Sequence, residues 1–258
     1  PGAGMKKTDD LFALTQANSI DLSKDGLEPV KSAAKDYSMV VVMGHQEVDG
    51  SVSGSTLFNS VAIIDADGRL LNNHRKLMPT NPERMVWGFG DGSTLRVVET
   101  AVGRVGALIC WENYMPLARM TMYGQGVEIY LSPTADARET WQATLRHIAC
   151  EGRCFVLGCN QFVRRDMYPD DMQALEELQH QPEVMCRGGS AIISPLGEVL
   201  AGPLYDQEGI LYVDLDLAEV VQSKLDFDVV GHYARPDVFQ LTVNERPAPP
   251  VQFTGNSE

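Results

Sequence analysis

Val105-Gly106-Ala107-Leu108-Ile109-Cys110-Trp111-Glu112-Asn113 is an apolar run that ends at a cysteine and continues into aromatic, acidic and amide residues. A short apolar run bounded by turn residues is typical of a buried strand. The residues from Met115 to Met120 predict a helix, because Pro116 suits a first helical turn, where its missing N–H costs nothing. We therefore expect Cys110 to lie at a strand-to-helix junction.

Cys110 at such a junction has two interpretations. A helix N-terminus stabilises negative charge and lowers the pKa of a thiol, which favours a nucleophile. Alternatively, Cys110 is a small hydrophobic residue at the end of a strand, since free cysteine is among the most buried residue types. A cysteine nucleophile needs partners elsewhere in the sequence, so this stretch alone leaves both interpretations open.

Composition narrows the class of protein. The chain has 258 residues and a net charge of −14, which argues against a general nucleic-acid surface. There is no run of 18 apolar residues and no signal peptide, so we expect a cytoplasmic protein without a membrane span. The five cysteines are odd in number and none has C-x-x-C spacing, which favours reduced thiols over disulfides or a zinc ribbon. We expect one domain over residues 1–258, with 226–258 as an extended C-terminal tail.

The order of predicted elements indicates the fold class. Some strands alternate with helices and others form hairpins, which fits a two-sheet α/β sandwich better than a doubly wound sheet. Residues 166–183 are polar and acidic and predict an exposed excursion. We expect strands at Met39–Gly44, Leu57–Ile64, Arg69–His74, Leu95–Glu99, Arg104–Ile109, Val127–Leu131, Cys154–Cys159, Ser190–Ser194, Glu198–Leu200 and Gly209–Leu215. The expected helices are Thr8–Asn18, Leu27–Lys35, a helix after Cys110 that ends near Tyr123, Thr140–Glu151 and Leu217–Leu225.

Two charged residues in the long loop at residues 75–92 are candidate partners of Cys110. A thiolate needs a cation or a base beside it. Lys76 could stabilise an oxyanion, and Glu83 could orient Lys76 and keep it charged. The alternative is that both are solvated surface charges, since Lys and Glu are mostly exposed.

Two histidines and a glycine-rich loop have weaker functional interpretations. His147 lies in a predicted helix between apolar neighbours, which favours a buried histidine with its hydrogen bonds satisfied over the base of a Cys–His pair. A charge on His74 would be unfavourable beside Arg75 and Lys76. Residues 88–92 are glycine-rich, but they lack the lysine and Ser/Thr of a P-loop, so a turn-rich loop is the better interpretation.

Taken together, the motifs around these residues resemble the nitrilase branch of the carbon–nitrogen hydrolase superfamily. The likeness covers nearly the whole chain, and the Cys-Trp-Glu-Asn form is similar to nitrilases rather than to amidases and carbamoylases. It implies an α-β-β-α sandwich with two mixed sheets. The motifs that carry it are His74-Arg75-Lys76-Leu77-Met78-Pro79-Thr80, Glu83-Arg84, Trp87-Gly88-Phe89-Gly90-Asp91-Gly92, Cys110-Trp111-Glu112-Asn113-Tyr114-Met115-Pro116-Leu117, Ser132-Pro133-Thr134-Ala135-Asp136, Glu151-Gly152-Arg153-Cys154-Phe155, Arg187-Gly188-Gly189-Ser190 and Phe227-Asp228-Val229-Val230-Gly231-His232-Tyr233-Ala234-Arg235-Pro236-Asp237.

The resemblance implies a catalytic set of Cys110 as nucleophile, Lys76 as the lysine and Glu83 as a supporting glutamate. The family's general base is a further glutamate in a Phe-Pro-Glu type motif after the first strand and helix, and this sequence has no such motif. Glu28 and Glu47 are the earlier glutamates, but Glu28 falls in a predicted helix and Glu47 follows the wrong strand. The resemblance therefore implies a chain that begins after the base, without the first strand and helix.

The reaction implied by the resemblance is hydrolysis of an organic nitrile to the carboxylic acid and ammonia through a cysteine thioimidate and thioester. It needs no metal or organic cofactor. The alternatives are an amidase or cyanide hydratase of the same superfamily, or a catalytically impaired fragment that lacks the base. Homodimers and spiral homo-oligomers occur in the family and are expected here. The residues expected to contact substrate are Trp111, Tyr114, Thr134 and Trp141.

Overall fold

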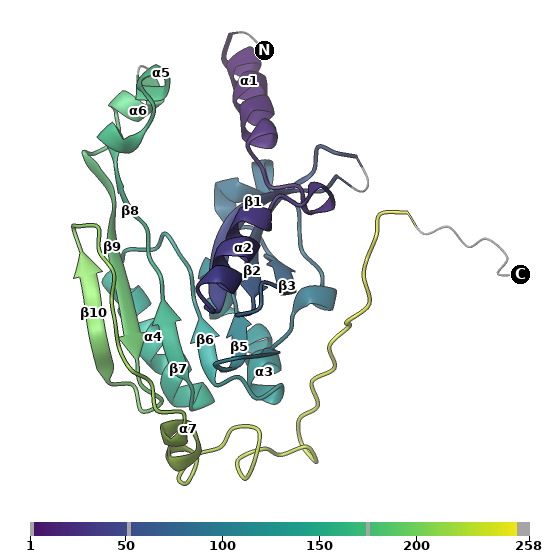
Figure 1. The fold of residues 1–258 in the computed structure, drawn as a ribbon, viewed down its shortest axis with the longest axis vertical. Helices are drawn as coiled ribbons and strands as arrows, with labels where there is room; N and C mark the ends of the chain where they lie inside the picture. The colour runs from purple at the N-terminus through teal and green to yellow at the C-terminus, as the bar shows by residue number, and fades with distance from the viewer. Residues whose placement is uncertain (1–2, 51–52, 174–175, 252–258) are drawn as a thin grey trace, which may run out of the picture.

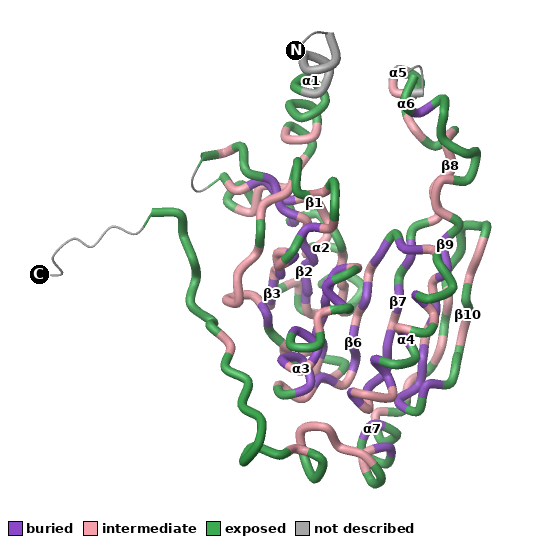
Figure 2. Tube along the Cα trace, turned by 180° about the vertical axis from the view of Figure 1, so that it is seen from behind, coloured by how far each residue is buried: buried purple, intermediate pink, exposed green. Residues whose placement is uncertain are grey.

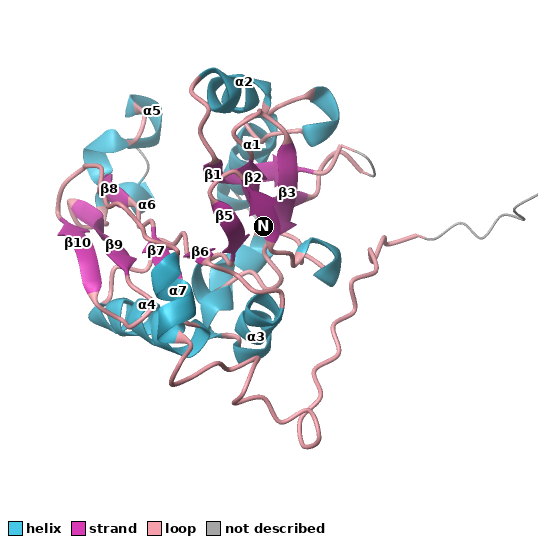
Figure 3. Cartoon of the chain, turned by 60° about the horizontal axis from the view of Figure 1, so that its bottom comes forward, coloured by secondary structure: helices cyan, strands magenta, loops and turns pink. Residues whose placement is uncertain are grey.

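The structure is a computed structural model that describes residues 3–50, 53–173 and 176–251. Two β-sheets face each other, as Figures 1 and 3 show. Helix α2 (Glu28–Asp36) covers the outer face of the smaller sheet. Helices α3 (Pro116–Gly124) and α4 (Glu139–Gly152) cover the outer face of the larger sheet. The predicted two-sheet α/β sandwich is therefore confirmed.

The smaller sheet contains β1 (Val41–Val48), β2 (Leu57–Ile64) and β3 (Leu70–Arg75) in that order, and both pairs are antiparallel. The expected hairpin joins β2 to β3 at Asp65-Ala66-Asp67-Gly68, where Gly68 has a φ of 87°. Glycine adopts this left-handed backbone without a Cβ clash, which explains why the turn forms here. A single parallel bridge between Ile20 and Glu47 adds to the other edge of β1.

The larger sheet is mixed and carries the stretch that ends at Cys110. Its parallel centre is formed by β5, β6 and β7, because the crossovers between them pass through α3 and α4. Antiparallel strands flank this centre, in the order β10-β9-β7-β6-β5-β4, and β8 pairs with β9. The strands are β4 (Val98–Thr100), β5 (Gly103–Ala107), β6 (Ile129–Leu131), β7 (Phe155–Gly158), β8 (Phe162–Arg164), β9 (Val184–Ile193) and β10 (Val199–Tyr205).

Two apolar layers hold these elements together. The first lies between the sheets, where Val61 and Ile63 of β2 face Val105 and Ala107 of β5. Full burial of a large apolar side chain contributes about 1.5–3 kcal/mol. Figure 2 shows buried residues concentrated along β2, β6 and β7. The second layer lies between the larger sheet and its helices and includes Tyr130, Trp141, Leu145, Ile148 and Val156.

The remaining helices are α1 (Ala3–Ala17), α5 (Asp170–Gln173), α6 (Glu176–Gln179) and α7 (Ala218–Ser223). Over residues 3–50, 53–173 and 176–251 there are also five short 3-10 helices: η1 (Leu22–Lys24), η2 (Asn81–Met85), η3 (Gly92–Thr94), η4 (Cys110–Tyr114) and η5 (Arg165–Met167). Helices α5 and α6 project away from the sheets (Figure 1), in agreement with the exposed excursion predicted at 166–183. Among the described residues, no helix is long and apolar enough to cross a membrane.

The prediction of a strand at Gly209–Leu215 is wrong, because these residues do not pair with another described strand. Those residues run outside any assigned strand, and no backbone hydrogen bond joins them to another described residue. Their side chains still alternate, because Leu215 packs between the sheets beside Ile63 and Val105, whereas Tyr212 is 80% exposed. The sequence pattern thus indicated which faces are buried, but a strand also needs a hydrogen-bonded neighbour.

The C-terminal tail has no helix or strand over its described part, residues 226–251, and residues 252–258 lie outside the described chain. Hydrogen-bonded turns interrupt it between Asp228 and Phe239, so the expectation of an extended tail holds only in part. Val229, Val230 and Val243 pack against the apolar layer that contains α3. The backbone N–H of Ala248 donates to the Asp91 carboxylate at 2.7 Å. The tail therefore runs over the surface near α3 and reaches the loop after β3.

Candidate active site

Cys110 lies where the sequence placed it, at the junction between a strand and a helix. Strand β5 ends at Ala107, the 3-10 helix η4 begins at Cys110, and α3 begins at Pro116. The backbone N–H of Cys110 donates to the Pro133 carbonyl at 2.8 Å, which ties the turn to the end of β6. Cys110 has a φ of 53°, a left-handed conformation that is rare for a residue with a side chain.

Asn113 holds this strained turn from inside the protein. Its side-chain amide donates to the carbonyl of Leu108 at 2.9 Å and to that of Cys110 at 2.8 Å. The Tyr130 hydroxyl donates to the Asn113 side-chain oxygen at 2.7 Å, and Arg119 donates to its backbone carbonyl at 2.7 Å. Asn113 is fully buried. A backbone conformation of this kind persists when its surroundings determine it, and Asn113 supplies much of that support.

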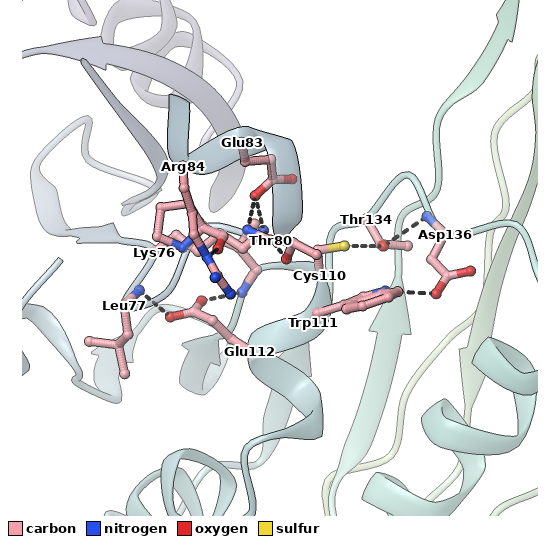
Figure 4. A network of polar contacts seen from close by, with 12 residues as sticks. Lys76, Leu77, Thr80, Glu83, Arg84, Cys110, Trp111, Glu112, Thr134 and Asp136 are labelled. Carbon is pink, nitrogen blue, oxygen red and sulfur yellow. Dashed lines mark hydrogen bonds and ion pairs between the residues drawn. The ribbon is translucent and has the colours of Figure 1, made fainter. Parts of the chain in front are cut away.

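Glu112 connects the nucleophile turn to the loop that carries Lys76. Its carboxylate accepts from the backbone N–H of Ile109 at 2.7 Å and from that of Leu77 at 2.6 Å. The Nε2 atom of His74 lies 3.1 Å from the same carboxylate, and both side chains are buried. This buried pair places Lys76 next to the turn of Cys110 (Figure 4).

The two histidines considered as bases have other partners. His74 contacts Glu112 and the Thr94 hydroxyl. The expectation of a buried His147 is wrong, because its side chain is 63% exposed and its Nε2 lies 3.5 Å from the carboxylate of Glu151, one helical turn later. Neither histidine is among the residues that line the cavity at Cys110.

Lys76 and Glu83 form an ion pair between a buried ammonium and a half-buried carboxylate rather than two solvated charges. Lys76 Nζ lies 2.6 Å from Glu83 Oε2 and donates to the Thr80 hydroxyl at 3.2 Å. The Thr80 backbone N–H donates to the same Glu83 oxygen at 2.7 Å, so the 3-10 helix η2 fixes the carboxylate. Lys76 is 1% exposed. A buried charge needs such a partner, because desolvation without one is costly.

A cavity of about 510 Å³ between the sheets contains the Cys110 side chain. One wall comes from the smaller sheet and the loop after β3, and the other comes from the ends of β5, β6 and β7. Glu83 is the only acidic residue among its described lining residues. The lining consists of Gly44, His45, Gln46, Asn59, Ser60, Glu83, Trp87, Ile109, Cys110, Pro133, Thr134, Ala135, Cys159 and Gln161.

The four predicted substrate contacts lie at different depths. Thr134 lines the cavity, and its Oγ1 is 3.0 Å from the Cys110 Sγ. Trp111 and Tyr114 are partly exposed and lie outside the residues that line this cavity, edge to face with ring centroids 5.8 Å apart. Trp141 is fully buried in the layer under the larger sheet, with its ring edge to face against Tyr114. Of the four, Thr134 alone is brought to Cys110, and substrate contact by the other three stays a prediction.

Asp136 organises the rim beside Thr134. The Trp111 indole N–H donates to its carboxylate at 2.9 Å, and Arg138 donates to both carboxylate oxygens. Burial opposes ionisation of Asp136, but these hydrogen bonds outweigh it and lower the pKa of its carboxyl group below the ordinary value. The Arg138 guanidinium also lies 5.0 Å from the Trp111 ring centroid, a cation–π distance.

The sequence did not single out Glu112, Asn113 or Asp136 for any role. Each of them lies inside a motif that carries the resemblance, within a few residues of Cys110 or Thr134. Their closeness in sequence to Cys110 and Thr134 was the only feature of the sequence that pointed to these residues. It does not reveal that the Glu112 and Asn113 side chains point inward and hold the backbone of the turn.

Comparison with known proteins identifies the family. Residues 11–224 match the carbon-nitrogen hydrolase family. The chain is 51% identical over 250 residues to a bifunctional nitrilase/nitrile hydratase of Lupinus angustifolius, covering 95% of this chain and 70% of that protein. It is 49% identical over 247 residues to a nitrilase of Bradyrhizobium diazoefficiens, with 95% and 75% covered. An aliphatic nitrilase of Sinorhizobium fredii is 48% identical over 237 residues, with 92% and 75% covered.

Solved structures agree on the fold. A carbon-nitrogen hydrolase from Helicobacter pylori superposes with a TM-score of 0.66 at 22% identity, over 81% of this chain and 72% of that one. Nit3 of Saccharomyces cerevisiae, a member of branch 10 of the nitrilase superfamily, superposes with a TM-score of 0.64 at 20% identity, over 79% and 69%. On these matches, the chain belongs to the carbon-nitrogen hydrolase family, in the nitrilase branch that the motifs around Cys110 predicted.

Proposed function

We propose that the cavity at Cys110 binds an organic nitrile and that the site converts it to the carboxylic acid and ammonia. The observation that carries this proposal is the placement of a half-buried cysteine on a strained turn, in one cavity with Glu83 of the Lys76–Glu83 ion pair. Relatives named as nitrilases, 48–51% identical to this chain, supply the substrate class.

The proposed reaction begins when the Cys110 sulfur adds to the nitrile carbon. The nitrile nitrogen takes up a proton, and the product is a thioimidate. Water adds to the thioimidate carbon, ammonia leaves, and a thioester remains. A second water hydrolyses the thioester to the acid and frees the thiol, so two waters are consumed for each nitrile. The Lys76 ammonium supplies positive charge for the tetrahedral intermediates, and Glu83 holds Lys76 in place.

We assign the general base to neither Glu28 nor Glu47. Glu28 is exposed on α2 and forms an ion pair with Lys31. Glu47 is buried at the end of β1, where Ser60, Asn73 and Arg75 donate to it. Neither carboxylate lines the cavity with Cys110. Loss of a general base typically slows a reaction by about 10²–10⁴-fold, and the attack of water on the thioimidate and on the thioester is the step that such a base assists.

A second product is favoured by one comparison. Several relatives, among them the lupin protein, are named as both nitrilase and nitrile hydratase. We propose that the tetrahedral intermediate can also lose the thiol instead of ammonia, which releases an amide. The bond that breaks in this case is C–S rather than C–N.

Product analysis tests both proposals. The protein is incubated with phenylacetonitrile and, separately, with butyronitrile, and acid, amide and ammonia are quantified by chromatography and an ammonia assay. Acid with equimolar ammonia supports the nitrilase, and amide without ammonia supports the hydratase branch. Cys110→Ala should remove both products, whereas Cys150→Ala, at a cysteine of similar burial outside the lining of this cavity, should retain them. Turnover by the Cys110→Ala protein at the wild-type rate would eliminate both proposals.

We also propose that the chain acts as one domain in a cytoplasmic homodimer or larger spiral homo-oligomer. The five cysteines are free thiols, which suits a reducing compartment. A groove of about 1020 Å³ runs between α3 and the tail, and it exposes Leu117 at 65% and Phe239 at 78%. Exposed apolar surface of this kind often marks an interface. Leu117→Asp should lower the mass measured by light scattering, whereas Tyr37→Asp, at a residue of similar exposure after α2, should not. An unchanged mass in Leu117→Asp would contradict this interface.

A further inference from the structure

Thr134 is tied to the nucleophile through the backbone before its side chain is considered. Its backbone N–H donates to the Cys159 carbonyl at 2.9 Å, and its carbonyl accepts from Gln161 at 3.2 Å. The carbonyl of the preceding Pro133 accepts the N–H of Cys110 at 2.8 Å. Thr134 is 7% exposed, and a β-branched side chain has few rotamers. Its hydroxyl is therefore held in a defined place beside Cys110.

The hydrogen bonds of this hydroxyl determine the direction of its own hydrogen. The backbone N–H of Asp136 donates to Thr134 Oγ1 at 3.0 Å. A hydroxyl has a single hydrogen, and Oγ1 lies 3.0 Å from the Cys110 sulfur. Because a thiolate has no hydrogen to give, the contact with ionised Cys110 requires that Thr134 be the donor. Hydrogen bonds to a charged partner are stronger than neutral ones, so this contact favours the thiolate over the thiol.

A surrounding hydrogen-bond network fixes the position of Asp136, whose backbone N–H donates to Thr134 Oγ1. The side-chain amide of Asn160 donates to the Asp136 carbonyl at 2.7 Å, and the Trp111 indole N–H donates to the Asp136 carboxylate at 2.9 Å. Arg138 donates to the same carboxylate. The peptide N–H that occupies Thr134 Oγ1 therefore cannot turn away without breaking several bonds. This rigidity is what preorganised stabilisation of charge requires.

From these contacts, we propose that Thr134 is a catalytic residue whose hydroxyl donates a hydrogen bond to the Cys110 sulfur and stabilises its thiolate. This role goes beyond the substrate contact expected for Thr134. It rests on the proposed function in one respect, that Cys110 is the nucleophile. When the sulfur adds to a nitrile carbon, the hydrogen bond is given up, and Thr134 regains it when the thiol is released.

The other titratable and charged groups near Cys110 are the same in the wild type and in every Thr134 variant. Their effect on Cys110 is therefore common to all the proteins compared. These groups come from five parts of the chain: the titratable His45 in β1, Lys76 directly after β3, Glu83 in η2, Glu112 in η4, and Asp136 with Arg138 after β6. A difference between Thr134 variants in the titration of Cys110 thus reports the hydroxyl itself.

The test measures alkylation of Cys110 in the whole protein and does not depend on nitrile turnover. Iodoacetamide is added across about pH 5 to 10, and the rate at the Cys110 peptide is followed by mass spectrometry for the wild type, Thr134→Ser and Thr134→Val; thiolate is the reacting form. We expect Thr134→Val to displace the alkylation profile toward higher pH, so that alkylation on the rising limb of the profile is about tenfold slower than in the wild type. Thr134→Ser keeps the hydroxyl and should titrate as the wild type does. Cys159, exposed in the same cavity, is the internal reference and should react alike in all three proteins.

The outcomes separate this proposal from the proposed function. A Thr134→Val profile equal to that of the wild type overturns the role of the hydroxyl, and so does a loss in Thr134→Ser as large as in Thr134→Val. If Thr134→Val does not fold, as judged by its thermal transition, Thr134→Ala replaces it with the same expected shift. A shifted profile in a protein that turns over no nitrile supports the role of Thr134 and contradicts the proposed function instead.

Discussion

Lys76 Nζ and Glu83 Oε2 are 2.6 Å apart in a pair whose ammonium side chain is inaccessible to solvent and whose carboxylate side chain is 26% exposed. Glu83 lines the cavity at Cys110, whereas Lys76 is not among the described residues that line it. A lysine in this position needs its counter-ion, because an unpaired buried charge is strongly destabilising. A substitution that breaks this pair is therefore expected to lower the free energy of unfolding as well as to displace the lysine that we propose stabilises the tetrahedral intermediates.

Replacement of Glu83 by glutamine should destabilise the protein. Glu83→Gln leaves Lys76 buried without a counter-ion, and the expected loss in the free energy of unfolding is about 3–5 kcal/mol. Urea denaturation measures this loss. Glu28→Gln removes the exposed partner of Lys31 and serves as the matched control, with no resolvable change expected. Equal stability of Glu83→Gln and the wild type would mean that Lys76 does not depend on the pair.

Removal of the Asn113 side chain should weaken the turn of Cys110. Asn113→Ala leaves the carbonyls of Leu108 and Cys110 and the Tyr130 hydroxyl without this partner. Each buried group left unsatisfied costs about 1–3 kcal/mol. We expect a lower free energy of unfolding and a slower alkylation of Cys110 at fixed pH. Asn18→Ala, which removes an exposed bond to the Leu14 carbonyl, should change neither measurement. Unchanged alkylation in Asn113→Ala would show that the turn is held by other contacts.

Glu151 should make stability depend on pH in the acid range. Burial opposes its ionisation, but hydrogen bonds from Arg119 and Tyr123 outweigh burial and lower the pKa of its carboxyl group below 4.5. A carboxyl with a lowered pKa in the folded state contributes stability above its unfolded pKa, and that stability is lost as the pH falls through its folded pKa. Denaturation of wild type and Glu151→Gln should therefore differ by a constant amount above about pH 5 and converge at lower pH.

The control for this comparison is Glu139→Gln, at an exposed glutamate in the first turn of the same helix. Its stability should follow that of the wild type more closely across the whole range. A Glu151→Gln protein whose deficit stays constant as the pH falls below the lowered pKa would contradict the assigned ionisation of Glu151.

Local patterns in the sequence predicted the fold class and the position of Cys110 because those features depend on short-range order. The apolar run before Cys110 and Pro116 after it determine a strand, a turn and a helix in succession. The pairing of Lys76 with Glu83 was one of two interpretations of their loop, which the family resemblance favoured, and the 3-10 helix η2 between Thr80 and Val86 brings the two side chains together.

Features that depend on distant partners could not be predicted in the same way. Gly209–Leu215 has the alternation of a strand, but its backbone has no hydrogen-bonded neighbour among the described residues. His147 is followed in sequence by the apolar residues Ile148 and Ala149, yet it faces outward on α4. The inward direction of Glu112 and Asn113 accompanies a left-handed backbone at Cys110. The sequence alone gives no sign of that conformation.

The central claim is that the Cys110 sulfur forms the covalent bond to the substrate carbon. Mass spectrometry of the protein after brief incubation with phenylacetonitrile and acid quenching tests it most directly. We predict an adduct of one nitrile, or of its acyl group, on the peptide that contains Cys110, and none on that peptide in Cys110→Ala. Slow attack of water would increase the adduct, so the measurement does not require rapid turnover. An adduct confined to another cysteine, or ammonia release by Cys110→Ala at the wild-type rate, would contradict the claim.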